Sequence, residues 1–360
     1  MTYQIEEFGI LKDGRKAHKI TLANNRGISI SFTNFGLNIL SIVVPDNNGV
    51  PTDIALGYDC IQGYETNNPM FGATVGRVIN RISNACFTLN DRTYVLVRNR
   101  GKNNIHSDKE HGFHKVLWDY EIFGESAVRF HYLSPDGENG FPGSVDMYIT
   151  YSLTENDSLI ASYLGDSDED TVLNPSNHCY FNLSGHKTGN MDDMEFRICA
   201  DHFTPTDEEV IPTGEIRSVA ETALDLRQWK TFPDMMKTDD HQIYQNGGFD
   251  HNFVLNYGQY GIRKAACARS VKTGIEMDIY TELPGLQFYT GHSLKQERGK
   301  EKMIYGPYAG FCMEPQYFPN SINTLQFEKP IFSSANPYRA NMIYLFRTNN
   351  TLKGVKAYGI

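Results

Sequence analysis

The sequence has no long apolar run, no concentrated basic stretch and no recognisable leader. No segment approaches the ~20 apolar residues that a membrane-spanning helix needs. The N-terminal stretch MTYQIEEFGILKDGRK has an acidic start and lacks the apolar core of a secretory signal. The 360 residues carry a formal net charge of −10, with Lys and Arg scattered along the chain. Because nucleic acids and anionic membranes favour a concentrated basic face, we expect neither as a partner.

Cysteine is sparse and shows no pairing pattern. The chain has six cysteines, all far apart and none in a CxxC motif: Cys60, Cys86, Cys179, Cys199, Cys267 and Cys312. Isolated cysteines in a long chain without an export signal are typical of a reducing compartment. We therefore expect free thiols and a cytoplasmic location.

The common cofactor and nucleophile motifs are also missing. The chain contains no GxGxxG fingerprint, no P-loop, no GxSxG elbow and no zinc signature. Their absence argues against the common nucleotide-cofactor and serine-hydrolase readings. We expect no cofactor.

The residues that are present favour sheet over helix. Aromatic residues make up 12% of the chain, mostly Tyr and Phe, and these residue types are enriched in strands. Apolar residues alternate with polar ones in Ile28–Phe32 and Val145–Leu153, as in half-buried strands. Asn48–Gly49 and Asn90–Asp91 are hairpin-turn signals. Further strands are expected at 38–44, 87–89, 94–97, 159–164, 196–200, 270–281, 287–290, 311–314 and 343–348.

Helical signals are few. Segments 59–67 and 226–237 have room for a turn or two of helix, and Pro233 interrupts the second. The strand signals continue evenly, with no linker, repeat or low-complexity tract. We therefore predict an all-β protein: one large antiparallel β-sandwich domain spanning residues 1–360, with few short helices.

The stretch NPSNHCYFNLSG, residues 174–185, is the strongest candidate for a functional segment. Its first residues are of types that favour turns, and the residues that follow favour an extended strand. Alternation would place Cys179, Phe181 and Leu183 on a core face. The opposite face would carry His178, Tyr180 and Asn182, all able to hydrogen-bond a ligand. We predict that His178 acts as an acid or base.

A second candidate segment is GFCMEPQYFPNSIN, residues 310–323. Alternation separates Phe311 and Met313 from Cys312, Glu314 and Gln316. Pro315 restricts Glu314 to extended backbone. A partly desolvated carboxylate at a strand end has a raised pKa and would suit a general base. A surface glutamate or a structural salt bridge is the alternative.

Histidines cluster in NIHSDKEHGFHKVLW, at His106, His111 and His114. Their spacing fits no strong metal motif, and the neighbouring carboxylates are equally typical of a solvated loop. We expect no metal site here. His106 also remains a candidate for contact with a ligand.

Three further segments carry polar residues near strand ends. In GRVINRI, Arg77 and Arg81 alternate with other residues and could simply bridge loops. In FDHNFVL, Asp250 and Asn252 share one side, although an aspartate there is often only a turn residue. PGLQFYTGH places Gln287 beside a ring. Together these planar polar and aromatic groups predict a pocket for a neutral polyhydroxyl ligand.

The motifs NPSNHCYFNLSG, EPQYFPNSIN, GRVINRI, FDHNFVL and PGLQFYTG, taken together, resemble the aldose 1-epimerase (galactose mutarotase) family, from about Thr33 to the C-terminus. The resemblance implies a galactose-mutarotase-like β-supersandwich. It also implies cofactor-free isomerase chemistry in hexose metabolism, in which the α and β anomers of a free aldose such as galactose or glucose are interconverted. The expected partner is a small sugar, bound by a monomer or homodimer.

The resemblance also implies roles for individual residues. His178 would be the general acid and Glu314 the general base. The sugar-binding residues would be Asn80, Arg81, His106, Asp250 and Gln287.

Two positions depart from the family pattern, and both surround the expected sugar-binding loop. The family usually has His-Gly-Gly where this chain has His106–Ser107–Asp108, and usually has Asp where this chain has His114. A disaccharide such as maltose is therefore an alternative substrate. A sugar-binding protein without turnover is a further alternative. Glycoside hydrolysis is disfavoured, because it normally needs two carboxylates facing one bond.

Overall fold

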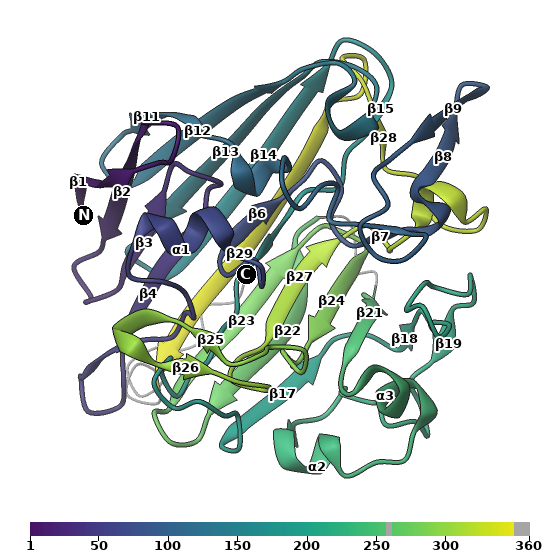
Figure 1. Cartoon of the computed structure of the whole chain (residues 1–360). Helices are drawn as coiled ribbons and strands as arrows, with labels where there is room; N and C mark the ends of the chain where they lie inside the picture. Colours follow the sequence, from purple (N-terminus) through teal and green to yellow (C-terminus); the bar gives the residue numbers. More distant parts are fainter. Residues whose placement is uncertain (257–260, 349–360) are drawn as a thin grey trace.

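The computed structural model describes residues 1–256 and 261–348 of the chain. Most of their regular structure lies in three larger sheets, of nine, five and five strands, and every pairing between these strands is antiparallel (Figure 1). The predicted all-β class with few short helices is confirmed. No helix in the described part of the chain is long and apolar enough to cross a membrane.

The nine-stranded sheet is the backbone of the fold. In spatial order its strands are β11 (Asp119–Phe123), β12 (Ala127–Ser134), β13 (Val145–Leu153), β14 (Ser158–Ser167), β29 (Tyr338–Thr348), β23 (Ile275–Thr281), β22 (Arg263–Ser270), β17 (Met194–Ile198) and β20 (Lys230–Thr231). β13 buries every second residue, as its alternating sequence predicts. The C-terminal strand β29 pairs with both β14 and β23, so it joins the earlier and later halves of the chain.

The first five-stranded sheet covers the β11–β14 half of the large sheet. It runs in chain order through β1 (Thr2–Ile10), β2 (Lys16–Ala23), β3 (Ser29–Thr33), β4 (Ile39–Pro45) and β5 (Pro51–Asp53). Phe32 on β3 stacks on Tyr151 of β13 with ring centroids 4.5 Å apart, and also contacts Phe130 of β12. These buried rings hold the two sheets face to face.

The second five-stranded sheet covers the other half. Its order is β19 (Arg217–Ser218), β18 (His202–Phe203), β21 (Asp250–Val254), β24 (Gly285–Tyr289) and β27 (Cys312–Gln316). Phe196 on β17 packs against Phe288 of β24 and Phe311 beside β27, at 5.1 and 4.9 Å between centroids. Figure 1 shows β27, β24 and β21 side by side in front of β23 and β22.

Short elements complete the fold. The three α-helices of the described residues are α1 (Ile61–Thr66), α2 (Phe232–Met236) and α3 (His241–Asn246). The smaller strand pairs are β6 (Ala73–Val75) with β16 (Ser176–His178), β7 (Arg81–Ile82) with β10 (Asn104–Ile105), β8 (Cys86–Leu89) with β9 (Arg92–Val95), β15 (Thr171–Val172) with β28 (Ile331–Phe332), and β25 (Glu297–Arg298) with β26 (Ile304–Tyr305).

Some predicted boundaries were wrong. Residues 270–281 form the end of one strand, a turn and a second strand, because Gly274 takes a positive φ of 68° that breaks the extended run. In the predicted helix 226–237 only α2 is helical. Pro233 lies in its first turn, where a missing N–H costs nothing, and so does not interrupt it. β1, β2 and α3 were missed. β1 is an exposed edge strand without a buried face, so it lacks an alternating pattern.

Candidate active site

His178 sits at the end of β16, which pairs with β6 so that His178 lies opposite Ala73. The chain leaves regular strand geometry immediately afterwards. Cys179, Phe181 and Leu183 enter the main core as predicted. The prediction for Asn182 is wrong: its side-chain amide donates to the backbone carbonyls of Asn190 and Ala309, at 2.8 and 2.9 Å. Asn182 therefore ties backbone segments together.

Glu314 lies on β27, directly opposite Gln287 of β24. β24 in turn pairs with β21, where Asp250 is opposite Tyr289 and Asn252 is opposite Gln287. Side chains directly opposite one another on antiparallel strands share a face. The sheet register therefore brings Glu314, Gln287 and the Asp250 side of β21 together.

His178 and Glu314 meet across the two elements. The distance from His178 Nε2 to Glu314 Oε1 is 3.5 Å, and the two residues are only 6% and 2% exposed. On the other side of the ring, Cys312 Sγ lies 3.7 Å from His178 Nδ1. Residues more than 130 positions apart in sequence thus form one buried acid–base pair with a thiol beside it.

Burial sets the protonation of this pair. It lowers the pKa of His178 to about 4, because the imidazolium loses its hydration. Burial, reinforced by the Asp250 carboxylate, raises the pKa of Glu314 well above its usual range, although Arg81 opposes this. The uncharged imidazole and the protonated carboxyl are therefore the favoured resting forms.

A charged network lies beside the pair. Arg81 Nη2 donates to Asp250 Oδ2 at 2.9 Å, and Gln287 Nε2 donates to Asp250 Oδ1 at 2.6 Å. Arg81 Nη1 also donates to Asn80 Oδ1 at 3.1 Å. Burial would raise the pKa of Asp250, but the Arg81 and His292 charges and these hydrogen bonds hold it well below its usual range. Asp250 is thus a fixed anion held between planar donors.

His106 faces His178, with the two rings edge to face and their centroids 5.3 Å apart. Its Nδ1 accepts a hydrogen bond from the backbone N–H of Asn80 at 3.1 Å. In the neutral ring this leaves the proton on Nε2. Burial lowers the pKa of His106 well below its usual value, with His178 and Arg81 adding to the effect.

The loop after His106 shows how this chain accommodates its departure from the family pattern. Ser107 has a positive φ of 59°, a conformation that favours glycine. Its hydroxyl accepts from the Val78 N–H and donates to the Val78 carbonyl, at 2.8 and 3.0 Å. Asp108 caps the next turn by accepting from the Glu110 N–H at 2.7 Å. Side-chain hydrogen bonds of Ser107 and Asp108 therefore hold the loop in a conformation that glycines would otherwise make accessible.

The histidine cluster does not form a metal site among the residues described. His111 is exposed and pairs with Asp108 at 3.5 Å. His114 is buried with Nε2 3.1 Å from the Lys109 carbonyl, and burial lowers its pKa to about 3. Over residues 1–256 and 261–348, the one group of three potential metal ligands is His178, Cys312 and Glu314.

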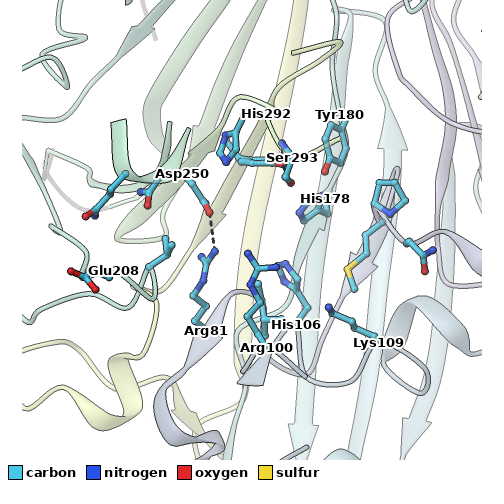
Figure 2. A pocket seen from close by; sticks show the side chains of 18 residues that line it. Arg81, Arg100, His106, Lys109, His178, Tyr180, Glu208, Asp250, His292 and Ser293 are labelled. Carbon is cyan, nitrogen blue, oxygen red and sulfur yellow. Dashed lines mark hydrogen bonds and ion pairs between the residues drawn. The ribbon is translucent and has the colours of Figure 1, made fainter. Parts of the chain in front are cut away.

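These residues adjoin a polar cavity of about 340 Å³ (Figure 2). His178, His106, Arg81 and Asp250 line it, and Figure 2 shows the Arg81–Asp250 pair on the side of the cavity away from Tyr180. Glu314, Gln287 and Asn80 are not on its lining and contact it through these neighbours. All seven predicted site residues therefore lie in one connected cluster.

Several lining residues were missed by sequence reasoning. They are Asn68, Pro69, Met70, Arg100, Ile105, Lys109, Glu208, Val210, Gln245, Asn246, Tyr289, His292 and Ser293. Tyr289 follows Gln287 on the same face of β24, so alternation could have found it. Arg77 and Asn252, by contrast, are structural. Arg77 donates to Ser134, to three backbone carbonyls and to Thr171, and Asn252 Nδ2 donates to Thr204 Oγ1.

Comparison with known proteins identifies the family. The family model described as aldose 1-epimerase matches residues 18–345. The chain belongs to the aldose 1-epimerase family. It is accordingly an enzyme of the epimerase or mutarotase type.

The sequence similarity to named relatives extends along most of the length of both chains. The galactose mutarotase of Sus scrofa is 36% identical over 344 residues, which cover 94% of this chain and 97% of that protein. The aldose 1-epimerase of Escherichia coli (strain K12) is 31% identical over 318 residues, covering 88% and 91%.

Solved structures of epimerase relatives have the same fold. A GalM/aldose epimerase homologue from C. elegans superposes with a TM-score of 0.84 at 26% identity, covering 91% of this chain and 98% of that one. A galactose 1-epimerase from Lactobacillus acidophilus NCFM gives 0.83 at 25% identity, covering 96% and 99%. The predicted galactose-mutarotase-like sandwich is confirmed.

Proposed function

We propose that this aldose 1-epimerase family member interconverts the α and β anomers of free aldoses such as galactose and glucose, with Glu314 as general base and His178 as general acid. The observation that carries the proposal is the contact of these two buried side chains, 3.5 Å apart, at a polar cavity. Placing both there disfavours the alternative of a binding protein without turnover.

The reaction needs only one base and one acid. The base removes the proton of the anomeric hydroxyl while the acid protonates the ring oxygen, which opens the pyranose. Rotation about the C1–C2 bond presents the other face of the aldehyde, and closure reverses both transfers. Positioned proton transfer of this kind typically contributes about 10²- to 10⁴-fold, and no cofactor or metal ion is required by these steps.

The protonation of the pair supports this assignment. The reactive form, imidazolium with carboxylate, and the resting form, imidazole with carboxyl, hold the same single proton. Ring opening moves His178 to imidazole and Glu314 to carboxyl, the forms that burial favours. The protein environment therefore stabilises the pair after ring opening, and the pair titrates as a unit.

We propose that the charged network holds the sugar. Asp250 accepts hydrogen bonds from sugar hydroxyls, while Arg81 and His106 donate to them from the cavity wall. Gln287 and Asn80 stand behind and orient these groups through their bonds to Asp250 and Arg81. Tyr180 and Tyr289, which also line the cavity, offer ring faces for the apolar side of a pyranose.

We also propose that residues 1–360 form one domain, although 257–260 and 349–360 lie outside the described residues. The support is β29, which shares one sheet with strands from both halves of the chain. A cytoplasmic location fits the six cysteines, all free thiols. The enzyme is proposed to be a monomer or homodimer, which light scattering of the purified protein would distinguish.

Polarimetry of freshly dissolved α-galactose and α-glucose tests the function. We expect the wild type to accelerate equilibration, and His178→Asn and Glu314→Gln each to lose at least about 100-fold in kcat. Exposed counterparts His111→Asn and Glu110→Gln are matched controls that should keep wild-type rates. Near wild-type rates in both site variants, with the fold retained by circular dichroism, would overturn the residue assignment.

A further inference from the structure

The pair that does the proposed chemistry has a third member that the reaction does not use. Cys312 lies two residues before Glu314 on the same face of β27, fully buried, with Sγ 3.7 Å from His178 Nδ1. One nitrogen, one sulfur and one oxygen from His178, Cys312 and Glu314 all lie within 4.8 Å of one another. Acid–base chemistry requires the imidazole and the carboxyl but gives the thiol no task.

We propose that His178, Cys312 and Glu314 form an inhibitory site for a soft divalent cation, with Zn²⁺ as the reference ion. The ligand set of one imidazole, one thiolate and one carboxylate is one that zinc accepts. A hard cation such as Mg²⁺ prefers oxygen ligands and should not bind here. The inhibitory consequence rests on the proposed function, because the cation would occupy the same imidazole and carboxylate that move the protons.

The geometry is close to what zinc needs. Zinc bonds of about 2.0–2.3 Å in a tetrahedron place ligand atoms about 3.3–3.8 Å apart. His178 Nε2 and Glu314 Oε1 are already separated by 3.5 Å. Cys312 Sγ lies 3.7 Å from the other ring nitrogen, Nδ1, and one ligand atom from each of the three residues lies within 4.8 Å of the others, about an ångström above the tetrahedral separation.

The charge balance also favours the complex. Zn²⁺ with one thiolate, one carboxylate and one neutral imidazole has zero formal charge, so burial imposes little penalty on it. The cation takes the place of the protons that Cys312 and Glu314 carry in the free protein. The three residues thus exchange two protons for one cation without leaving a net buried charge.

One of the three ligands borders the sugar cavity. Of the three ligands only His178 lines the cavity, so an ion can reach the triangle from that side. Three protein ligands leave a fourth position for water in a tetrahedral zinc site. Because the ion and a productively bound sugar need the same His178 and Glu314 atoms, inhibition should be competitive with sugar.

The test combines a binding readout with an activity readout. Cobalt(II), which replaces zinc in such sites and is visible, should give a thiolate-to-cobalt charge-transfer absorption with the wild type. Cys312→Ser and Cys312→Ala should lose this band. Zinc titration during polarimetry should inhibit the wild type, with reversal by chelator, and both variants should need at least about 10-fold more zinc to halve their own metal-free rate.

Cys60→Ser is the control, because Cys60 is the exposed cysteine and the easiest non-specific zinc target. It should keep the cobalt band and wild-type zinc sensitivity. A wild type without the band, or Cys312 variants with unchanged zinc sensitivity, would overturn the proposal. A band without any mutarotation in metal-free protein would keep the metal site and reject the proposed function instead.

Discussion

Buried neutral histidines make the stability of this protein sensitive to mild acid. Burial lowers the pKa of His251 to about 4, as it does for His178, and the pKa of His114 to about 3. In the unfolded chain a histidine titrates at about 6.5. The folded state therefore binds fewer protons than the unfolded state between those values, and the unfolding free energy falls as pH drops through this window.

The magnitude follows from linkage. For each of these histidines, moving from about pH 7.5 to about pH 5 removes about 2 kcal/mol of stability. His114, His178 and His251 together remove about 6 kcal/mol. Glu314 acts in the opposite sense, because burial raises its pKa and the folded state therefore binds a proton more readily than the unfolded state.

His251 isolates this effect from catalysis. It lies on the core side of β21 between Phe203 and Phe249, is fully buried and is not itself among the residues that line the cavity. In His251→Gln the difference in unfolding free energy between about pH 7.5 and about pH 5 should shrink by about 2 kcal/mol, whatever the variant's absolute stability.

Urea unfolding at the two pH values measures these differences. His202→Gln, at an exposed position of neighbouring β18, is the control and should keep the wild-type difference. If His251→Gln showed the same pH dependence as the wild type, the buried imidazole would not be the cause and the reasoning would be wrong.

The candidate site and the buried Arg77 give three further predictions. Asp250→Asn removes the anion that Arg81 pairs with, and kcat/KM in polarimetry should fall by about 10- to 100-fold; unchanged kcat/KM would exclude Asp250 from sugar binding. Arg77→Met leaves buried carbonyls without a donor, so urea unfolding should show a loss of about 3 kcal/mol or more with KM unchanged; a raised KM would contradict a purely structural role. The acid limb of kcat/KM against pH should lie near the pKa of about 4 that burial gives His178, and a limb at the ordinary value of about 6.5 would contradict that assignment.

Local patterns predicted the strands well where one face is buried. The alternation in Val145–Leu153 became β13 with every second residue in the core. The same reasoning failed for Thr2–Ile10, which forms an edge strand with nearly all residues exposed and so carries no period-two signal. It also failed at Asn182, since a strand was assumed to continue past His178, where the chain instead leaves the ladder.

The sequence predicted which residues gather at the candidate site, but it did not predict how deeply they are buried or which other residues line the cavity. The motifs pointed to His178, Glu314 and the proposed sugar-binding residues, and all of them lie in one cluster, while their roles stay predictions. The sequence could not show that Glu314 would be only 2% exposed and absent from the cavity lining. It also could not show that Arg100 and Lys109 would line the cavity. Those facts depend on how β27 and the segments on both sides of β10 pack, which involves residues distant in the chain.

The position of the pair follows from how the sheets are joined. His178 belongs to a short ladder with β6, whereas Glu314 belongs to the five-stranded sheet through β24. The two ladders are held together just beyond the pair, where Phe181 exchanges backbone hydrogen bonds with Phe311 at 2.7 and 2.9 Å. Phe181 lies three residues after His178, and Phe311 lies three residues before Glu314. This bridge therefore constrains the distance between the imidazole and the carboxyl group. A change that loosened the bridge would therefore separate the imidazole of His178 from the carboxyl of Glu314 without touching either residue.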